Sequence, residues 1–304
     1  MIIGHQKQWQ FLKRSAELGK ISHAYLFCGQ ENLGKKNLAF EFAKLLTGQN
    51  IPNPDLILIE PEGEEIQISQ IRDLIWKLSL KPYSAPFKVA IVDQAHSMNS
   101  EAQNCFLKTL EEPKDKTILI LITEYPEILF PTILSRCEII KFYPVSETEI
   151  KNYLESKETP EKEIQEIIKI SQGRPGIAID FISNPKKLEN QRKKLKELIK
   201  ILNSDLVVRF NYVKDLSQNI QEVKEALNVW LSYFRNILIS RLNLKPKQAS
   251  SIQGSEKFKF GFERDNYSFE RLKNNLNLLQ RTNFLIFKTN INPRLALENL
   301  MLEL

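Results

Sequence analysis

The feature that most restricts how this chain can fold is a glycine loop between an apolar run and an amphipathic segment. Residues 23–28, HAYLFC, form a short and largely apolar run that ends at Gly29, as buried strands do. The loop GQENLGKK fills residues 29–36 and fits the pattern G-x-x-x-x-G-K-[ST] up to its last residue. The apolar residues of NLAFEFAKLL, which follows, recur at helical spacing. We therefore predict a strand, a phosphate-binding loop and a helix, in that order.

Each fixed residue of this loop has a physical task. Gly29 and Gly34 let the backbone wrap closely and direct its N–H groups at phosphate oxygens, while Lys35 would reach the outer phosphates. The helix behind the loop adds the positive end of its dipole. The candidate ligand is therefore a nucleotide, ATP or ADP.

The residue after Lys35 departs from the pattern. A serine or threonine at this position would ligate magnesium, whereas the ammonium of Lys36 has no lone pair and would repel a divalent cation. Two interpretations of Lys36 stay open. Its ammonium could lie where the metal would lie and offset phosphate charge, which would allow nucleotide to bind without hydrolysis. It could instead be a solvated lysine in the first helical turn, beside a pocket that holds nothing.

A second departure follows the apolar run KVAIVD at residues 88–93. Asp93 has the place of a strand-end carboxylate that holds magnesium, and the next residue would polarise the attacking water. That residue is Gln94, whose amide cannot accept a proton and so cannot act as a general base. Thr123, which ends another apolar run, completes the candidate nucleotide site. Because two catalytic positions are weakened together, we expect little or no hydrolysis in this pocket.

The first part of the chain alternates between apolar runs and helical segments. Strands are expected at 23–28, 55–60, 88–93, 117–123 and 138–142, with helices between them that include 7–18, 68–80 and 100–110. Strands that are apolar throughout and separated by helices indicate a parallel sheet covered on both faces. The expected fold class is thus α/β for residues 1–144, a nucleotide-binding-type domain with a five-stranded parallel sheet.

After Pro144 no strong strand pattern remains. Short helices are expected over 146–154, over 162–171 and from Ile177 on, with a turn at 173–176, and long helices from Pro185 on with a loop-like stretch over 245–265. These segments predict a small helical lid domain, 145–184, and an all-α C-terminal domain, 185–304. Within the latter an apolar stripe at helical spacing belongs either to the internal core or to a contact with a neighbouring subunit; its members are Val223, Leu227, Trp230, Leu231 and Phe234.

One arginine has a position that suggests phosphate chemistry. In PTILSRC, residues 131–137, a helical turn begun by proline ends at Arg136, directly before the last expected strand. Arginine supports the charge that develops on a transferring phosphoryl group, and it can do so across a subunit interface. The alternative is an ordinary surface arginine.

Composition excludes several classes of protein. The formal net charge of +6 is compatible with a nucleic-acid partner, and residues 186–200 hold seven basic and two acidic residues, which form a solvated helix face or a DNA contact. No two of the three cysteines lie within four residues of each other, so their spacing does not match a zinc knuckle. No run approaches the length of about 20 apolar residues that spans a membrane. The N-terminal MIIGHQKQWQ lacks a signal-peptide core, so the cytoplasm is the expected compartment.

Taken together, these segments resemble the clamp-loader branch of the AAA+ ATPases. The resemblance rests on HAYLF (23–27), GQENLGKK (29–36), VDQAH (92–96), NCFLKTLEEP (104–113), SRC (135–137) and NINPRLALE (290–298). Within that branch the weakened site is similar to that of the delta-prime family of bacterial DNA polymerase III.

The resemblance implies a place in a hetero-pentameric ring with gamma/tau and delta subunits. Such a ring opens the sliding clamp and places it on primer-template DNA during replication, with the C-terminal domain as its collar. The resemblance also implies that Arg136 reaches the ATP of an adjacent gamma/tau subunit, while this chain hydrolyses little or no ATP itself.

Two features of the family are missing or hard to place. Many members carry a four-cysteine zinc module after the first helix, but no cysteine lies between Thr47 and Asp55, so zinc is not expected. Arg174 in GRPG is nearest to the family's sensor arginine, although Pro175 beside it weakens the match. Two rival functions stay open: an active gamma/tau-type ATPase, and a non-enzymatic DNA-binding protein that uses residues 186–200.

Overall fold

The computed structural model describes residues 2–48, 53–83, 85–113, 116–242, 268–289 and 291–304. The chain divides into two compact units, Met1–Ile182 and Ser183–Leu304. The stretch expected as a loop, 245–265, lies outside the described residues, as does Asn290. The lid expected over 145–184 falls mostly within the first unit, and its separation as a domain of its own stays a prediction.

The first unit is built on the predicted parallel sheet, which is confirmed. Its five strands are β1 (Ala24–Cys28), β2 (Leu56–Ile59), β3 (Lys88–Val92), β4 (Thr117–Thr123) and β5 (Glu138–Lys141). They lie in the order β2-β3-β4-β1-β5, and all neighbours are parallel. Each strand is bordered by helices or loops that return the chain to the starting edge, as parallel pairing requires.

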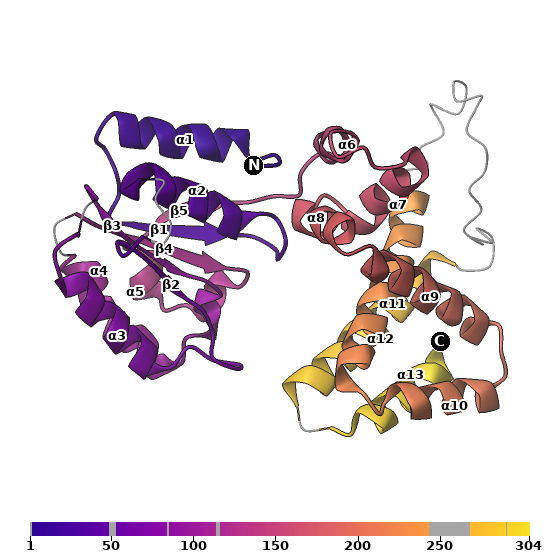
Figure 1. The fold of residues 1–304 in the computed structure, drawn as a ribbon. Coiled ribbons are helices and arrows are strands. Elements are labelled where there is room, and N and C mark those ends of the chain that lie inside the picture. Colours follow the sequence, from indigo (N-terminus) through magenta and orange to yellow (C-terminus); the bar gives the residue numbers. More distant parts are fainter. Residues whose placement is uncertain (1, 49–52, 84, 114–115, 243–267, 290) are drawn as a thin grey trace. The chain divides into compact units, whose positions relative to one another are not determined.

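Helices cover both faces of the sheet because alternate residues of a strand point to opposite sides. In β1, Tyr25 and Phe27 pack with α1 (Gln6–Glu17) and α2 (Lys35–Thr47) on one face. Leu26 belongs to the core on the other face. Helices α3 (Ile68–Ser79), α4 (Ser100–Glu111) and α5 (Pro131–Leu134) cover that face (Figure 1). Two short 3₁₀ turns, Ala95–Ser97 and Pro126–Ile128, follow β3 and β4.

Three short helices complete the first unit: α6 (Glu147–Glu155), α7 (Glu161–Ser171) and α8 (Pro175–Ser183). A capping box between Ser146 and Glu149 starts α6. The turn expected at 173–176 is too long by two residues, because α8 already begins at Pro175. Proline is favoured in the first helical turn, where its missing N–H costs nothing.

The second unit is all-α, as predicted. Its helices are α9 (Pro185–Leu202), α10 (Leu206–Leu216), α11 (Ile220–Leu242), α12 (Phe269–Lys288) and α13 (Pro293–Glu303). Of the predicted apolar stripe, Leu231 is partly buried and the other four side chains are fully buried in the core of this unit. The stripe is therefore internal core rather than a contact with a neighbour. In the motif near the C-terminus, Asn292 caps α13 by accepting a bond from the N–H of Arg294 at 2.9 Å.

None of the helices in the described part of the chain combines the length and the apolar character that crossing a bilayer requires.

Candidate functional site

The sheet brings four strand ends to one edge. Because all strands are parallel, their carboxyl ends meet at the same edge, where ligands bind in folds of this type. Glu60 follows β2, Asp93 follows β3, Thr123 ends β4, and Gly29 follows β1. The strand order places these residues in that same sequence along the edge. The predicted loop thus faces the predicted carboxylate, together with Glu60, which was not predicted.

The loop after β1 needs glycine at both of the predicted positions. Gly29 has a φ of +151°, and a Cβ there would come within 2.6 Å of the carbonyl oxygen of Phe142. Gly34 has a φ of +90° and precedes the first residue of α2. Side chains larger than glycine are strained in this region of the backbone map. Gly29 lets the loop pass close to Phe142, which follows β5, and Gly34 lets the chain enter α2.

Lys35 is held inside the loop. Its side chain is buried, and its ammonium donates to the carbonyl oxygens of Gly29 and, at 2.5 Å, of Gln30. These bonds use two of the three N–H donors of an ammonium group. Burial lowers the pKa of Lys35, because an apolar environment penalises the charged form. The ammonium of Lys35 is therefore enclosed by its own loop, and its contact with a phosphate stays a prediction.

Two further contacts fix the loop from outside. The ring Nε2 of His5 lies 2.9 Å from the carbonyl oxygen of Leu33 and donates to it. The backbone N–H of Gly176, in the first turn of α8, donates to the carbonyl oxygen of Asn32 at 2.8 Å. Four loop carbonyls, at residues 29, 30, 32 and 33, are thus bonded by the chain itself. No pattern in the sequence indicated either outer contact.

Lys36 has acidic partners that neither interpretation of the sequence included. Its ammonium lies 3.0 Å from Oδ2 of Asp93 and also pairs with Glu60. Partial burial acts to lower the pKa of Lys36, but the two carboxylates outweigh it and the pKa lies above its usual value. Lys36 is therefore a charged member of an ion triad with Glu60 and Asp93.

The other candidates at this edge are placed as follows. The side chain of Gln94 is exposed, and its backbone N–H donates to Oδ1 of Asp93 at 3.0 Å. Thr123 is buried, its hydroxyl lies 3.2 Å from Nδ1 of His96, and it accepts a bond from the N–H of Tyr125 at 3.0 Å. Thr123 thus connects β4 to the segment after β3. No carboxylate follows Asp93 directly.

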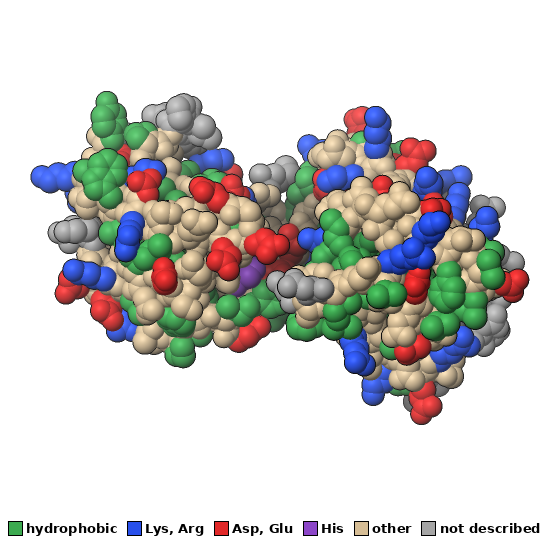
Figure 2. Space-filling view, turned by 90° about the horizontal axis from the view of Figure 1, so that it is seen from below, with side chains coloured by type: hydrophobic (Ala, Val, Ile, Leu, Met, Phe, Trp, Pro, Cys, Tyr) green, Lys and Arg blue, Asp and Glu red, His purple; other side chains and the backbone are tan. Residues whose placement is uncertain are grey.

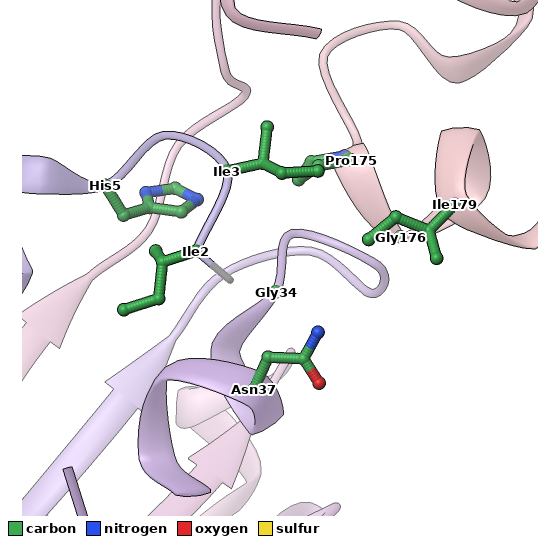
Figure 3. A pocket seen from close by; sticks show the side chains of 8 residues that line it. All are labelled: Ile2, Ile3, His5, Gly34, Asn37, Pro175, Gly176 and Ile179. Atoms are coloured by element: carbon green, nitrogen blue, oxygen red, sulfur yellow. The ribbon is translucent and has the colours of Figure 1, made fainter. Parts of the chain in front are cut away.

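A narrow pocket lies between the loop and α8. Figure 3 shows Gly34 and Asn37 on one side of it, and Pro175, Gly176 and Ile179 across from them. The space open to the centres of water molecules is about 20 Å³, which suits about one water and is far below the roughly 300 Å³ of a small-ligand site. Ile2, Ile3 and His5 of the N-terminal segment complete its wall.

Arg136 lies at the opposite edge of the sheet. It directly precedes Cys137 and β5, so it is near the amino ends of the strands, while the loop follows the carboxyl end of β1. Four residues of strand span about 13 Å, which separates Arg136 from the loop of its own chain. Its guanidinium pairs with Glu111 at 2.8 Å and donates to the carbonyl oxygen of Thr132 at 2.9 Å.

This pair joins two of the sequence motifs. Glu111 belongs to the segment 104–113 and Arg136 to the segment 135–137, and no local pattern indicated that they meet. The side chain of Arg136 keeps 34% of its surface exposed. Arg136 is therefore oriented by the chain and partly exposed.

The remaining candidates are Arg174 and the basic segment 186–200. Arg174 precedes α8, and its Nε donates to the carbonyl oxygen of Ser171 at 3.2 Å. In α9, Lys194 is buried and pairs with Glu225 of α11. Lys193 pairs with Glu197 within the helix. Part of the basic charge of α9 is thus used inside the second unit.

Comparison with known proteins finds relatives among the subunits of DNA polymerase III. The delta' subunit of DNA polymerase III from Bacillus subtilis is 35% identical over 162 residues, which are 48% of this chain and 49% of that protein. The gamma subunit from Buchnera aphidicola is 27% identical over 224 residues, 66% of this chain and 62% of that protein. The matches thus span about half to three fifths of the length of these relatives.

A solved structure extends the likeness in fold to the whole chain. A gamma subunit-related protein of DNA polymerase III from Thermotoga maritima covers 97% of both chains at a TM-score of 0.60 and 22% sequence identity. A family model described as "DNA polymerase III, delta subunit" matches residues 4–53 and 48–146. Residues 4–146, slightly under half of the chain, are thus similar to the family described as DNA polymerase III, delta subunit, and they hold the loop, Asp93 and Arg136.

Proposed function

We propose that this chain is the delta-prime-type subunit of a bacterial clamp loader. It assembles with gamma/tau-type and delta-type subunits in a ring of five, and the ring loads a sliding clamp onto primer-template DNA in the cytoplasm. The chain contributes a nucleotide-binding-type domain (1–144), a lid (145–184) and a collar (185–304). It supplies Arg136 to the ATP of a neighbouring subunit and turns over little or no ATP itself.

One observation carries the proposal: Arg136 lies at the sheet edge opposite its own loop. Since the strand length alone keeps it from a phosphate bound in its own pocket, its only reachable nucleotide is one held by an adjacent subunit. Glu111 and the carbonyl oxygen of Thr132 hold the guanidinium at this edge. A guanidinium offered in this way is suited to stabilise the charge of a transferring phosphoryl group.

The weakened loop supports the second half of the proposal. Lys36 pairs with Asp93, the carboxylate that would hold magnesium, and Gln94 cannot act as a base. An active gamma/tau-type ATPase is the main rival. Purified chain that turns over ATP in a magnesium-dependent reaction would favour that rival.

The surface of the second unit is compatible with a collar. Hydrophobic side chains are exposed on α10 at Leu206, Val207 and Val208, and on α13 at Leu295 and Leu302. Figure 2 shows one face of the surface, on which hydrophobic side chains lie among basic and acidic ones. Exposed apolar groups of this kind are frequent where subunits assemble. A DNA-binding protein that uses α9 alone is the other rival, and it predicts tight, steeply salt-dependent binding of DNA by the isolated chain.

The test is Arg136→Ala in a complex reconstituted with the gamma/tau-type and delta-type subunits of the same organism. Arginines supplied across an interface accelerate phosphoryl transfer by roughly 10³-fold or more. We expect a loss of this order in single-turnover hydrolysis at the adjacent site, with assembly unchanged in gel filtration.

Two matched variants sharpen this test. Glu111→Gln removes the ion pair but keeps the guanidinium, and an exposed pair is worth at most about 1 kcal/mol, so the loss should stay below about fivefold. Arg14→Ala removes an exposed arginine of α1 and should change nothing. Hydrolysis by the Arg136→Ala complex at the unaltered rate would exclude the proposed role of Arg136.

A further inference from the structure

Asp93 has the carboxylate that would hold a metal in this fold, and both of its oxygens already contact other groups of the chain. Oδ2 of Asp93 lies 3.0 Å from the ammonium of Lys36, and Oδ1 accepts the backbone N–H of Gln94 at 3.0 Å. The side chain of Asp93 is only 15% exposed, so few other directions of approach remain. Glu60, from the end of β2, pairs with the same ammonium.

Magnesium does not fit this arrangement. The ion takes six oxygen ligands at about 2.0–2.1 Å in near-octahedral geometry. Lys36 occupies the helix position from which a hydroxyl would ligate the metal, and its ammonium lies against the oxygen that would be a second ligand. An ammonium and a divalent cation at the same carboxylate repel each other. The residues present therefore exclude the ion that the loop pattern implies.

Charge explains what the lysine does in place of a metal. The carboxylates of Asp93 and Glu60 share one ammonium, whose positive charge offsets the repulsion between them. Lys36 provides one positive charge, so the triad keeps a net charge of −1, whereas magnesium in place of the lysine would leave the two carboxylates at a net charge of zero. A nucleotide phosphate that approaches the loop therefore meets excess negative charge beyond Lys35.

We propose that Lys36 is a built-in replacement for a divalent cation, and that it masks a latent site for a magnesium–nucleoside triphosphate formed by Asp93, Glu60 and the loop 29–35. The inference rests on the proposed function, because that function includes an inactive pocket. It adds that Lys36 is the residue that keeps the pocket inactive. Lys36→Ser supplies the missing hydroxyl and removes the excluding charge in a single step.

The experiment is a titration of a fluorescent ATP analogue into the full-length chain, with and without magnesium. For Lys36→Ser we expect magnesium to tighten binding at least about tenfold, and manganese binding to become visible by electron paramagnetic resonance. For the wild type we expect no magnesium-dependent gain. Lys36→Met, which removes the charge without offering a ligand, should show none either.

Lys44→Ser is the matched control for a lost lysine. Lys44 lies in the same helix and also pairs with a carboxylate, that of Glu41 at 3.2 Å. It belongs to the last turn of α2, whereas Lys36 belongs to the first. Binding by Lys44→Ser should equal that of the wild type. Lys36→Thr replaces the serine variant if that chain does not show the circular dichroism of the folded protein.

Two results overturn the inference. One is a magnesium-dependent gain in the wild type equal to that of Lys36→Ser; the other is a folded hydroxyl variant that gains nothing. Assembly with partner subunits is measured separately by gel filtration. A hydroxyl variant that assembles normally but binds no magnesium–nucleotide would refute the role of Lys36 and leave the proposed function intact.

Discussion

At the scale of single residues, two adjacent lysines have acquired opposite environments. Lys35 is buried and bonded to carbonyl oxygens of its own loop, while Lys36 points to two carboxylates at the ends of β2 and β3. The side chains are chemically identical, and successive positions on a helix point about 100° apart. The direction of each side chain therefore decides whether its ammonium meets loop carbonyls or carboxylates.

His5 allows a test of the loop through pH. Burial lowers the pKa of His5 below its usual 6.5, and the bond to Leu33 only partly offsets this effect. The unfolded chain then binds the proton at a higher pH than the folded chain does. The contribution of a neutral His5 to stability is therefore complete above about pH 6.5 and declines as the pH falls from there toward the lowered value.

We expect the free energy of unfolding of the wild type to fall more between pH 7.5 and pH 5.5 than that of His5→Asn. Asparagine tolerates the positive φ of 56° at this position and does not titrate. Urea denaturation at the two pH values measures the difference. Equal pH dependence of both chains would show that protonation of His5 does not change the stability of the folded protein.

At the scale of elements, the start of α8 is fitted to the loop by a glycine. A Cβ at Gly176 would lie 2.9 Å from the carbonyl oxygen of Asn32 and 3.1 Å from its Cα. These are backbone atoms, and the same pair of residues shares a hydrogen bond of 2.8 Å. The lid helix therefore lies on the loop at a distance that only glycine permits.

Gly176→Ala tests this fit because two effects oppose each other. Alanine in a helix is favoured over glycine by about 1 kcal/mol, while overpacking typically costs about 1–3 kcal/mol. The clash with the backbone of Asn32 should outweigh the gain in helix propensity, so we expect a net destabilisation of about 1 kcal/mol in urea denaturation. A stabilised variant would mean that α8 moves away from Asn32 at little cost.

At the scale of the whole molecule, the two units have separate cores. The core of Ser183–Leu304 consists of residues from α9 to α13, and the two cores of Met1–Ile182 lie on the two faces of its sheet. Helix-rich units of this size commonly fold on their own when they bury a core of their own. Each unit therefore buries a core of its own, as a unit that folds alone requires.

We expect residues 183–304, expressed alone, to fold and to unfold in one cooperative thermal transition. Circular dichroism should report the helical content, and calorimetry the cooperativity. The full chain should show more than one transition, since multi-unit proteins depart from two-state behaviour. A fragment that lacks a cooperative transition would show that the second unit depends on the first.

Much of the fold was predictable because its signals are local. Apolar runs of strand length and the helical spacing between them identified all five strands, and the loop pattern identified Gly29, Gly34 and Lys35. The sequence also predicts a weakened catalytic site, since Lys36 and Gln94 stand where the chemistry requires other residue types, and this stays a prediction. The roles proposed for Arg136 and for the pocket stay predictions from motif and family.

The partners of these residues depended on the tertiary structure. Lys36 contacts Glu60, 24 positions away, because the parallel sheet brings the carboxyl end of β2 to the same edge as the start of α2. Local periodicity carries no information about strand order, so neither Glu60 nor the contact of Glu111 with Arg136 was visible in it. From the sequence alone, Lys36 stands at the position where the loop pattern has a hydroxyl residue; the fold decided which partners this lysine meets, because only folding brings two carboxylates to one ammonium.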